Sequence, residues 1–282
     1  MDLVNQADII RKDHPGCGVE KMYKTLSPRF IGRDKFCEIF MDLGYRVRTI
    51  KNYSKTTIPI YLNYPNFIEG MQVTNKHQVL QSDITYFYLN ECFYYIVFII
   101  DVYTRKIIGY NVSKSMRHES NLKALKMALK EIEPESRVNM IHHSDRGSQY
   151  GSKPYVKMLK DSEIKISMGL KAQDNAYAER INGTIKNEYL KLWKIKDFKD
   201  LKVKTRKAVN HYNSKRGHSS LPKDLAPNKF EEYLLNLENQ ERPTVIIYAD
   251  GNYKVKVASS HHDFITQERP LAHNCPIIIN EE

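Results

Sequence analysis

Between residues 77 and about 190 the hydrophobic period of the sequence changes repeatedly, in an order that few folds can accommodate. Runs rich in β-branched and aromatic residues predict strands at 79–89, 92–102, 106–113, 138–144 and 163–168. Apolar residues at helical spacing predict helices at 119–131, about 153–161 and from Asp174 onward. Short links join the first three strands, which indicates an antiparallel meander. The order predicts an α/β domain whose mixed sheet is flanked by helices.

Three carboxylates occupy unusual places in this pattern. Asp83 lies inside the first strand, Asp145 ends the fourth, and Glu179 lies in the helix after the fifth. Aspartate is a poor strand former, so its presence in a strand suggests a functional role. Magnesium prefers oxygen ligands, and two such ions about 3.5–4 Å apart can clamp the attacking and leaving oxygens of a phosphodiester displacement. If the three acids converge, the chain cuts or joins nucleic acid; otherwise each is an ordinary turn or surface acid.

The amino-acid composition narrows the classes of molecule that this protein could bind. The 282 residues carry 44 Lys and Arg against 33 Asp and Glu, a net charge of +11, which favours a polyanionic partner. Contact with a ribosome or a membrane surface would fit that charge equally well. The longest apolar run, residues 93–100, is too short to cross a bilayer. Four cysteines without a CxxC spacing indicate reduced thiols, so we expect a cytoplasmic protein that faces nucleic acid and no membrane.

The segments on either side of the core have their own patterns. Residues 1–52 predict three short helices, which is consistent with a helix-turn-helix DNA-binding domain or with an ordinary three-helix bundle. A string of cations that includes Arg46 and Arg48 favours DNA contact, although a solvated linker would look much the same. We expect a linker at 53–76, the catalytic core at 77–192, a basic helical extension at 193–238 and a β-like tail at 239–282, to which no function is assigned.

Other polar residues divide into candidate DNA contacts and residues with structural roles. Asn175, Asn182 and Lys186 share a helix face with Glu179, and Arg146 follows Asp145, so all four are candidate DNA contacts. Asp101 is interpreted as a hairpin-corner residue that pairs with Arg105. His142 and His143 should point to opposite faces of their strand, with His143 nearer the site. The cluster His261, His262, His273 and Cys275 matches no zinc spacing.

Five ordered motifs carry a resemblance to a known family. They are Ser82-Asp83-Ile84-Thr85-Tyr86; residues 101–109, DVYTRKIIG; residues 143–150, HSDRGSQY; residues 174–179, DNAYAE, with Lys186; and Tyr212-Asn213 through Arg216, His218 and Leu221 to Pro227. With them the chain resembles an insertion-sequence transposase of the IS three family, whose core is similar to that of retroviral integrases and has a ribonuclease-H-like fold.

The resemblance implies a DDE transposase. Asp83 would bridge two Mg²⁺ ions, Asp145 and Glu179 would each hold one, and Mn²⁺ may substitute. The enzyme would cleave transposon ends and join the 3′-hydroxyl to another phosphodiester. Its partners would be terminal inverted repeats, target DNA, further copies of itself on paired ends, and a helix-turn-helix and leucine-zipper protein from an upstream frame. A ribonuclease-H-like nuclease without strand joining and a non-catalytic DNA-binding regulator remain alternatives.

Overall fold

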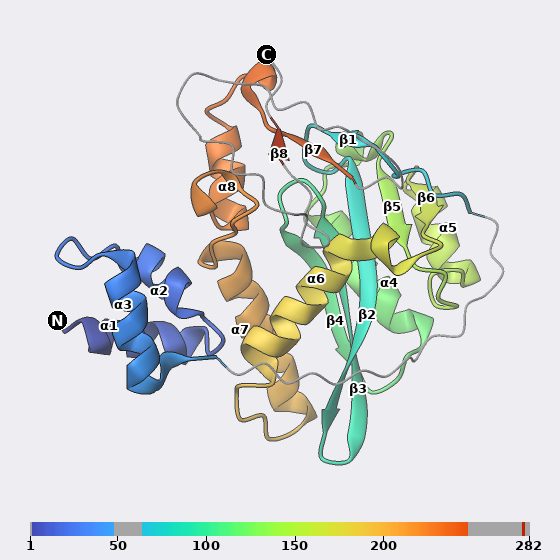
Figure 1. Cartoon of the computed structure of the whole chain (residues 1–282). Coiled ribbons are helices and arrows are strands. Elements are labelled where there is room, and N and C mark those ends of the chain that lie inside the picture. The colour runs from blue at the N-terminus through green and yellow to red at the C-terminus, as the bar shows by residue number, and fades with distance from the viewer. Residues whose placement is uncertain (1, 48–63, 248–277, 280–282) are drawn as a thin grey trace.

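The computed structural model describes residues 2–47, 64–247 and 278–279 and contains a five-stranded mixed sheet (Figure 1). Its strand order is β4-β3-β2-β5-β6, in which β2, β3 and β4 are antiparallel and β5 and β6 run parallel to β2. The strands are β2 (Val79–Leu89), β3 (Cys92–Asp101), β4 (Ile107–Ser113), β5 (Ile141–Ser144) and β6 (Lys165–Met168). The prediction of a ribonuclease-H-like mixed sheet flanked by helices is confirmed.

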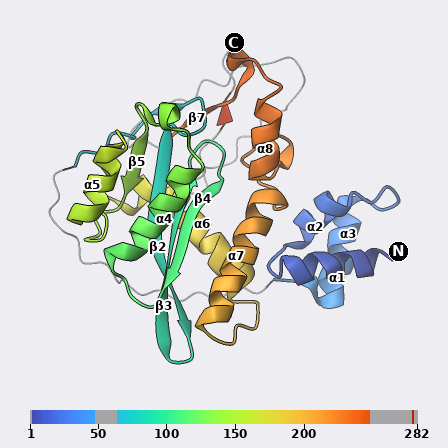
Figure 2. The same cartoon turned by 180° about the vertical axis from the view of Figure 1, so that it is seen from behind.

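Helices cover both faces of this sheet. One face carries α4 (His118–Lys130) and α5 (Lys153–Asp161), as Figure 2 shows from behind. Gly109 of β4 allows α4 to come close, because a Cβ there would lie 2.3 Å from the carbonyl oxygen of Ala124. The other face carries α6 (Ala176–Thr184), whose Ile181 is buried against the sheet (Figure 1). The sheet therefore has an apolar core on each side.

The chain after α6 continues along the same face. A wider helical turn (Ile185–Leu190) extends α6 and is followed by α7 (Phe198–Ser214) and α8 (Pro227–Leu234). Single 3₁₀ turns lie at Pro134–Arg137, Ala172–Asn175, Pro222–Asp224 and Asn239–Glu241. In the part of the chain that the structure describes, no helix combines the length and the apolar character needed to cross a membrane.

A second, small sheet combines strands of the C-terminal tail with a strand from the segment before the core. Strand β7 (Thr244–Ile246) pairs with β1 (Gln72–Val73) and with β8 (Ile278–Ile279), both antiparallel. Residues 72–73 thus form a strand inside the segment expected to be a linker. That strand was missed because two residues carry too little periodicity to predict one. Residues 248–277 of the expected β-like tail, which include His261, His262, His273 and Cys275, lie outside the described residues.

The N-terminal residues form three helices around a core of their own. These are α1 (Leu3–Asp13), α2 (Val19–Leu26) and α3 (Arg33–Phe40), which bury Met22, Phe36 and Phe40 between them. A wider turn (Met41–Tyr45) follows α3, and Gly44 has a φ of 88°, the left-handed conformation of a helix C-cap. Arg46 is exposed just beyond it, whereas Arg48 lies outside the described residues.

The three N-terminal helices attach to the core through Glu188. Its carboxylate accepts two 2.8 Å hydrogen bonds from Arg216 and one of 2.7 Å from His14 Nε2, and Lys21 Nζ lies 3.5 Å away. Its backbone carbonyl accepts from Gly16 N–H at 2.7 Å. Burial by itself raises the pKa of Glu188, but the hydrogen bonds from Arg216 and His14 outweigh it and hold this pKa far below its usual range.

Replacing Glu188 should therefore loosen this attachment. E188A leaves the guanidinium of Arg216 buried without its partner, so we expect a loss of about 3 kcal/mol in the free energy of unfolding, the lower end for breaking a buried ion pair. Chemical denaturation measures this loss, and E38A, which removes an exposed i,i+3 pair with Lys35, is the matched control.

The lowered pKa of Glu188 also fixes the pH dependence of this contribution. Because the folded pKa lies below the unfolded one, the contribution is present above the unfolded value of about 4.3 and is lost as pH falls through the folded value. The stability difference between wild type and E188A should therefore be constant near neutral pH and shrink in acid. A difference that grew as pH fell would contradict this assignment.

Candidate active site

The parallel pairing of β2 with β5 brings Asp83 and Asp145 together. Ser82 is opposite Ser144 in this register, so Asp83, the next residue within β2, lies beside Asp145, the first residue after β5. Asp83 and Asp145 line one small pocket, together with Ile84, Thr85, Tyr86, Tyr95, Met116 and Gln149. Asp145 follows the carboxyl end of β5, the position at which open sheets present groups to a ligand.

Electrostatics link Glu179 to this pair. The pKa of Asp83 is raised to about 7, first by burial, then by the charge of Asp145 and to a smaller extent by that of Glu179. Burial also raises the pKa of Asp145, against the effect of its hydrogen bond from Gly147 N–H. The pKa of Glu179 is raised by the loss of solvent around its carboxyl group and then by Asp145, although the side chain as a whole is exposed. The three carboxylates are thus near enough to repel one another.

The donor chemistry suits a hard divalent cation. The three groups are carboxylates, which such ions prefer, and a cation among them would offset both their burial and their mutual repulsion. Among the described residues, no three His, Cys, Asp or Glu side chains already stand in the close group that a metal ion requires.

Gln81 fixes the start of α6 against β2. Its side-chain oxygen accepts from the backbone N–H groups of Tyr177 (3.2 Å) and Ala178 (3.3 Å), and its amide donates to the carbonyl of Asp174 (3.2 Å). These N–H groups belong to the first turn of α6, where no helical partner exists. Sequence reasoning missed this fully buried residue; the available signal was an amide on the same strand face as Asp83, two residues away.

Two asparagines continue the contact between α6 and β2. Asn175 donates to the carbonyl of Ser82 (2.9 Å), and Asn182 donates to the carboxylate of Asp83 (2.7 Å). Their exposed fractions are only 3% and 5%, so they offer little surface to DNA, for which both were candidates. The hydrogen bond from Asn182 instead sets the orientation of the Asp83 carboxylate.

The two basic candidates of the core remain partly accessible. Lys186 Nζ donates to Thr85 Oγ1 at 3.0 Å and lies 5.1 Å from the ring centroid of Tyr86. Burial, followed by Lys191, lowers the pKa of Lys186. Arg146 is partly exposed beside Asp145. Both cations thus border the pocket of the strand acids, and Lys186 is tied to β2 like the two asparagines.

The neighbouring acid and histidines have structural partners. Asp101 is buried, but it does not pair with the Arg105 side chain as expected; its carboxylate accepts from Thr104 N (2.7 Å), Thr104 Oγ1 (2.9 Å) and His77 N (2.5 Å). The turn after β3 presents the two Thr104 donors, and the segment before β2 presents His77 N. His142 bonds Tyr155 Oη (2.9 Å) on the α5 side, whereas His143 bonds Ser167 Oγ (2.8 Å) and lies near Asp174.

The contacts of Gln81 lead to a prediction about stability. Q81M keeps the length of the side chain but leaves two buried helix N–H groups without an acceptor, so unfolding should require about 1–3 kcal/mol less free energy. Q149M, which removes a single bond to the Met116 carbonyl, is the control and should cost less. Equal losses in thermal unfolding of the two variants would contradict a special role for Gln81.

Comparison with known proteins agrees with this geometry. Two family models, each described as an integrase core domain, match residues 73–173 and 160–225. The insertion element IS600 uncharacterized 31 kDa protein of Shigella sonnei is 33% identical over 210 residues, which cover 72% of this chain and 75% of that protein.

Further relatives match over shorter lengths. The transposase for insertion sequence element IS629, also of Shigella sonnei, is 38% identical over 141 residues, 49% of this chain and 47% of its own length. Among solved structures, the HTLV-2 integrase catalytic core domain in complex with magnesium gives a TM-score of 0.43 at 16% identity and covers 58% of this chain and 98% of that one. Given its relatives and its integrase core domain, the chain belongs to the IS three family of insertion-sequence transposases.

Proposed function

We propose that this chain cleaves the ends of its DNA element and joins the freed 3′-hydroxyl to another phosphodiester, with Asp83, Asp145 and Glu179 as the catalytic carboxylates. The observation that supports this most is that Asp83 and Asp145, from neighbouring strands, line one pocket. Glu179 of α6 lies near enough for its charge to add to the effect of burial on the pKa of Asp83. A net charge of +11 suits a partner as highly charged as DNA.

Each carboxylate has a distinct part in this proposal. Asp83, Asp145 and Glu179 would hold magnesium, with two of these ligands supplied by neighbouring strands and one by α6. Two bound Mg²⁺ ions, or Mn²⁺ in their place, would lower the pKa of the attacking water or hydroxyl and stabilise the leaving 3′-oxygen. Asn182 keeps the Asp83 carboxylate oriented.

The binding partners follow from the same proposal. Lys186 and Arg146 contact phosphates near the site, and Arg46 and Arg48 of the N-terminal unit (residues 1–52) contact DNA farther away. The DNA is that of terminal inverted repeats and of the target, so the protein acts on the nucleoid. Copies of the chain assemble on paired ends, and a helix-turn-helix and leucine-zipper protein from an upstream frame joins them as a separate chain or by fusion.

Isosteric removal of each carboxylate tests the chemistry. D83N, D145N and E179Q should each reduce cleavage and joining of labelled element-end oligonucleotides by more than about 100-fold, since even outer-shell residues of metal sites cost 10–100-fold. Joined products from the wild type, and not only nicks, are required to separate a transposase from a nuclease.

The same variants should still bind DNA, because none of them loses a cation. E135Q, which neutralises an exposed acid in the turn after α4, is the matched control and should retain full activity. Retained joining in any of the three site variants would remove that residue from the catalytic set.

The role of Asn182 can be measured through metal affinity alone. N182A leaves the Asp83 carboxylate without its 2.7 Å donor, and the Kd for Mn²⁺ in calorimetric titration should rise about 10–100-fold. N187A, an exposed asparagine on the extension of α6, should leave this Kd unchanged. An unchanged Kd in N182A would show that Asn182 does not prepare the site for metal.

A further inference from the structure

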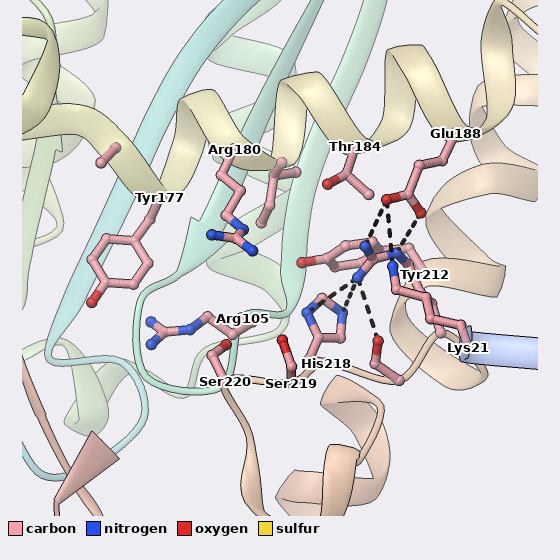
Figure 3. A pocket seen from close by; sticks show the side chains of 14 residues that line it. Lys21, Arg105, Tyr177, Arg180, Thr184, Glu188, Tyr212, His218, Ser219 and Ser220 are labelled. Atoms are coloured by element: carbon pink, nitrogen blue, oxygen red, sulfur yellow. Dashed lines mark hydrogen bonds and ion pairs between the residues drawn. The ribbon is translucent and has the colours of Figure 1, made fainter. Parts of the chain in front are cut away.

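A second cavity lies beside α6, away from the three carboxylates. It has a volume of about 220 Å³ and is bounded by α6, the turn between β3 and β4, and the segment that joins α7 to α8 (Figure 3). Its charged lining residues are Lys21, Arg105, Arg180, Arg216 and Glu188. Four cations thus face a single carboxylate, and that carboxylate already accepts hydrogen bonds from Arg216 and His14.

Arg105 is the most unusual of these cations. Only 5% of its surface is exposed, and its guanidinium stacks over the ring of Tyr177 at 4.2 Å. Nη1 donates to the carbonyl of Val102, whereas Nη2 is buried and has no hydrogen-bond partner. A buried charged donor without an acceptor is unfavourable, so binding of an anion at this atom would be stabilising.

The rest of the lining supplies further donors. Figure 3 shows Arg180 pointing from α6 toward Arg105, Ser219 and Ser220. His218 is buried beside them, and its pKa is lowered to about 2, first by burial and then by Arg216, Lys21 and Arg105. His218 is therefore neutral, and the three nearby cations add to the effect of its burial.

We propose that this cavity binds a phosphate group of a DNA strand that passes along α6 on the side away from the carboxylates. Guanidinium groups match phosphate oxygens with paired donors, and serine hydroxyls can complete the contact. Glu179 and Arg180 are consecutive, so they leave α6 about 100° apart. One helix thereby presents an acid to the reacting site and a cation to the cavity.

The choice of DNA as the source of the phosphate rests on the proposed function. A free nucleotide or inorganic phosphate would offer the same oxygens, so the experiment must separate the two sources. The test variants are R180Q, which removes an exposed cation of the lining, and S220D, which places a negative charge in the cavity. K126Q removes an exposed cation from α4, on the opposite face of the sheet, and is the matched control.

Binding of a short labelled duplex is measured by fluorescence anisotropy over a series of NaCl concentrations, after thermal unfolding has shown that each variant is folded. The Kd should rise about tenfold in R180Q and in S220D, as expected for a lost charge-assisted contact. The slope of log K against log salt should also become shallower by about 0.9 in R180Q, since one phosphate contact is gone. K126Q should change neither quantity.

A second measurement, calorimetric titration with adenosine monophosphate and with inorganic phosphate, tests whether the cavity binds small phosphates in place of DNA. The proposal is overturned if the Kd for the duplex is unchanged in both R180Q and S220D. It is also overturned if the two variants weaken binding of adenosine monophosphate or inorganic phosphate but leave duplex binding unchanged. Because the readout is binding, it is independent of the three carboxylates. Normal strand joining with unaltered duplex binding in the variants would refute this inference and leave the proposed function intact.

Discussion

The site depends on a row of polar contacts that holds α6 across β2. Gln81, Asp83 and Thr85 lie on one face of the strand, and each bonds to α6 or its extension. A single hydrogen bond of this kind contributes only about 0.5–1.5 kcal/mol. Burial of Ile181 and Ile185 adds apolar stabilisation to the packing of α6 on the sheet. Apolar packing alone would tolerate a helix that slides, whereas the polar contacts allow one position.

Because α6 has one fixed position, its side chains point in defined directions. Glu179 faces the strand acids, and Arg180 faces the basic cavity, so one helix presents an acid to the first site and a cation to the second. The extension of α6 then carries Glu188, which binds the N-terminal helices through His14 and the α7–α8 segment through Arg216. A displacement of α6 would thus change the positions of Glu179, Arg180 and Glu188 together, and with them the carboxylate site, the cavity and the attachment of the N-terminal unit.

The strand acids illustrate a conflict between stability and function. A carboxyl group whose pKa is raised to about 7 by burial and by a neighbouring acid is destabilising as an anion. The fold holds Asp83 in place with Asn182 and sets Lys186 within electrostatic reach, yet the pKa of Asp83 remains raised. Such an arrangement is expected where further positive charge arrives with a divalent metal ion.

Local patterns in the sequence determined the elements of the core and their order, because hydrophobic period and turn residues act over a few neighbours. They also singled out Asp83 as an acid inside a strand, Asp145 as an acid at the carboxyl end of a strand, and Glu179 as an acid on a polar helix face. The roles of Gln81, Asn175 and Asn182, the pairing of β1 with β7, and the grouping of Arg105 with Arg180 were decided by the tertiary structure alone. Each of these joins residues far apart in the chain, and a sequence records no distance between residues that only folding brings together.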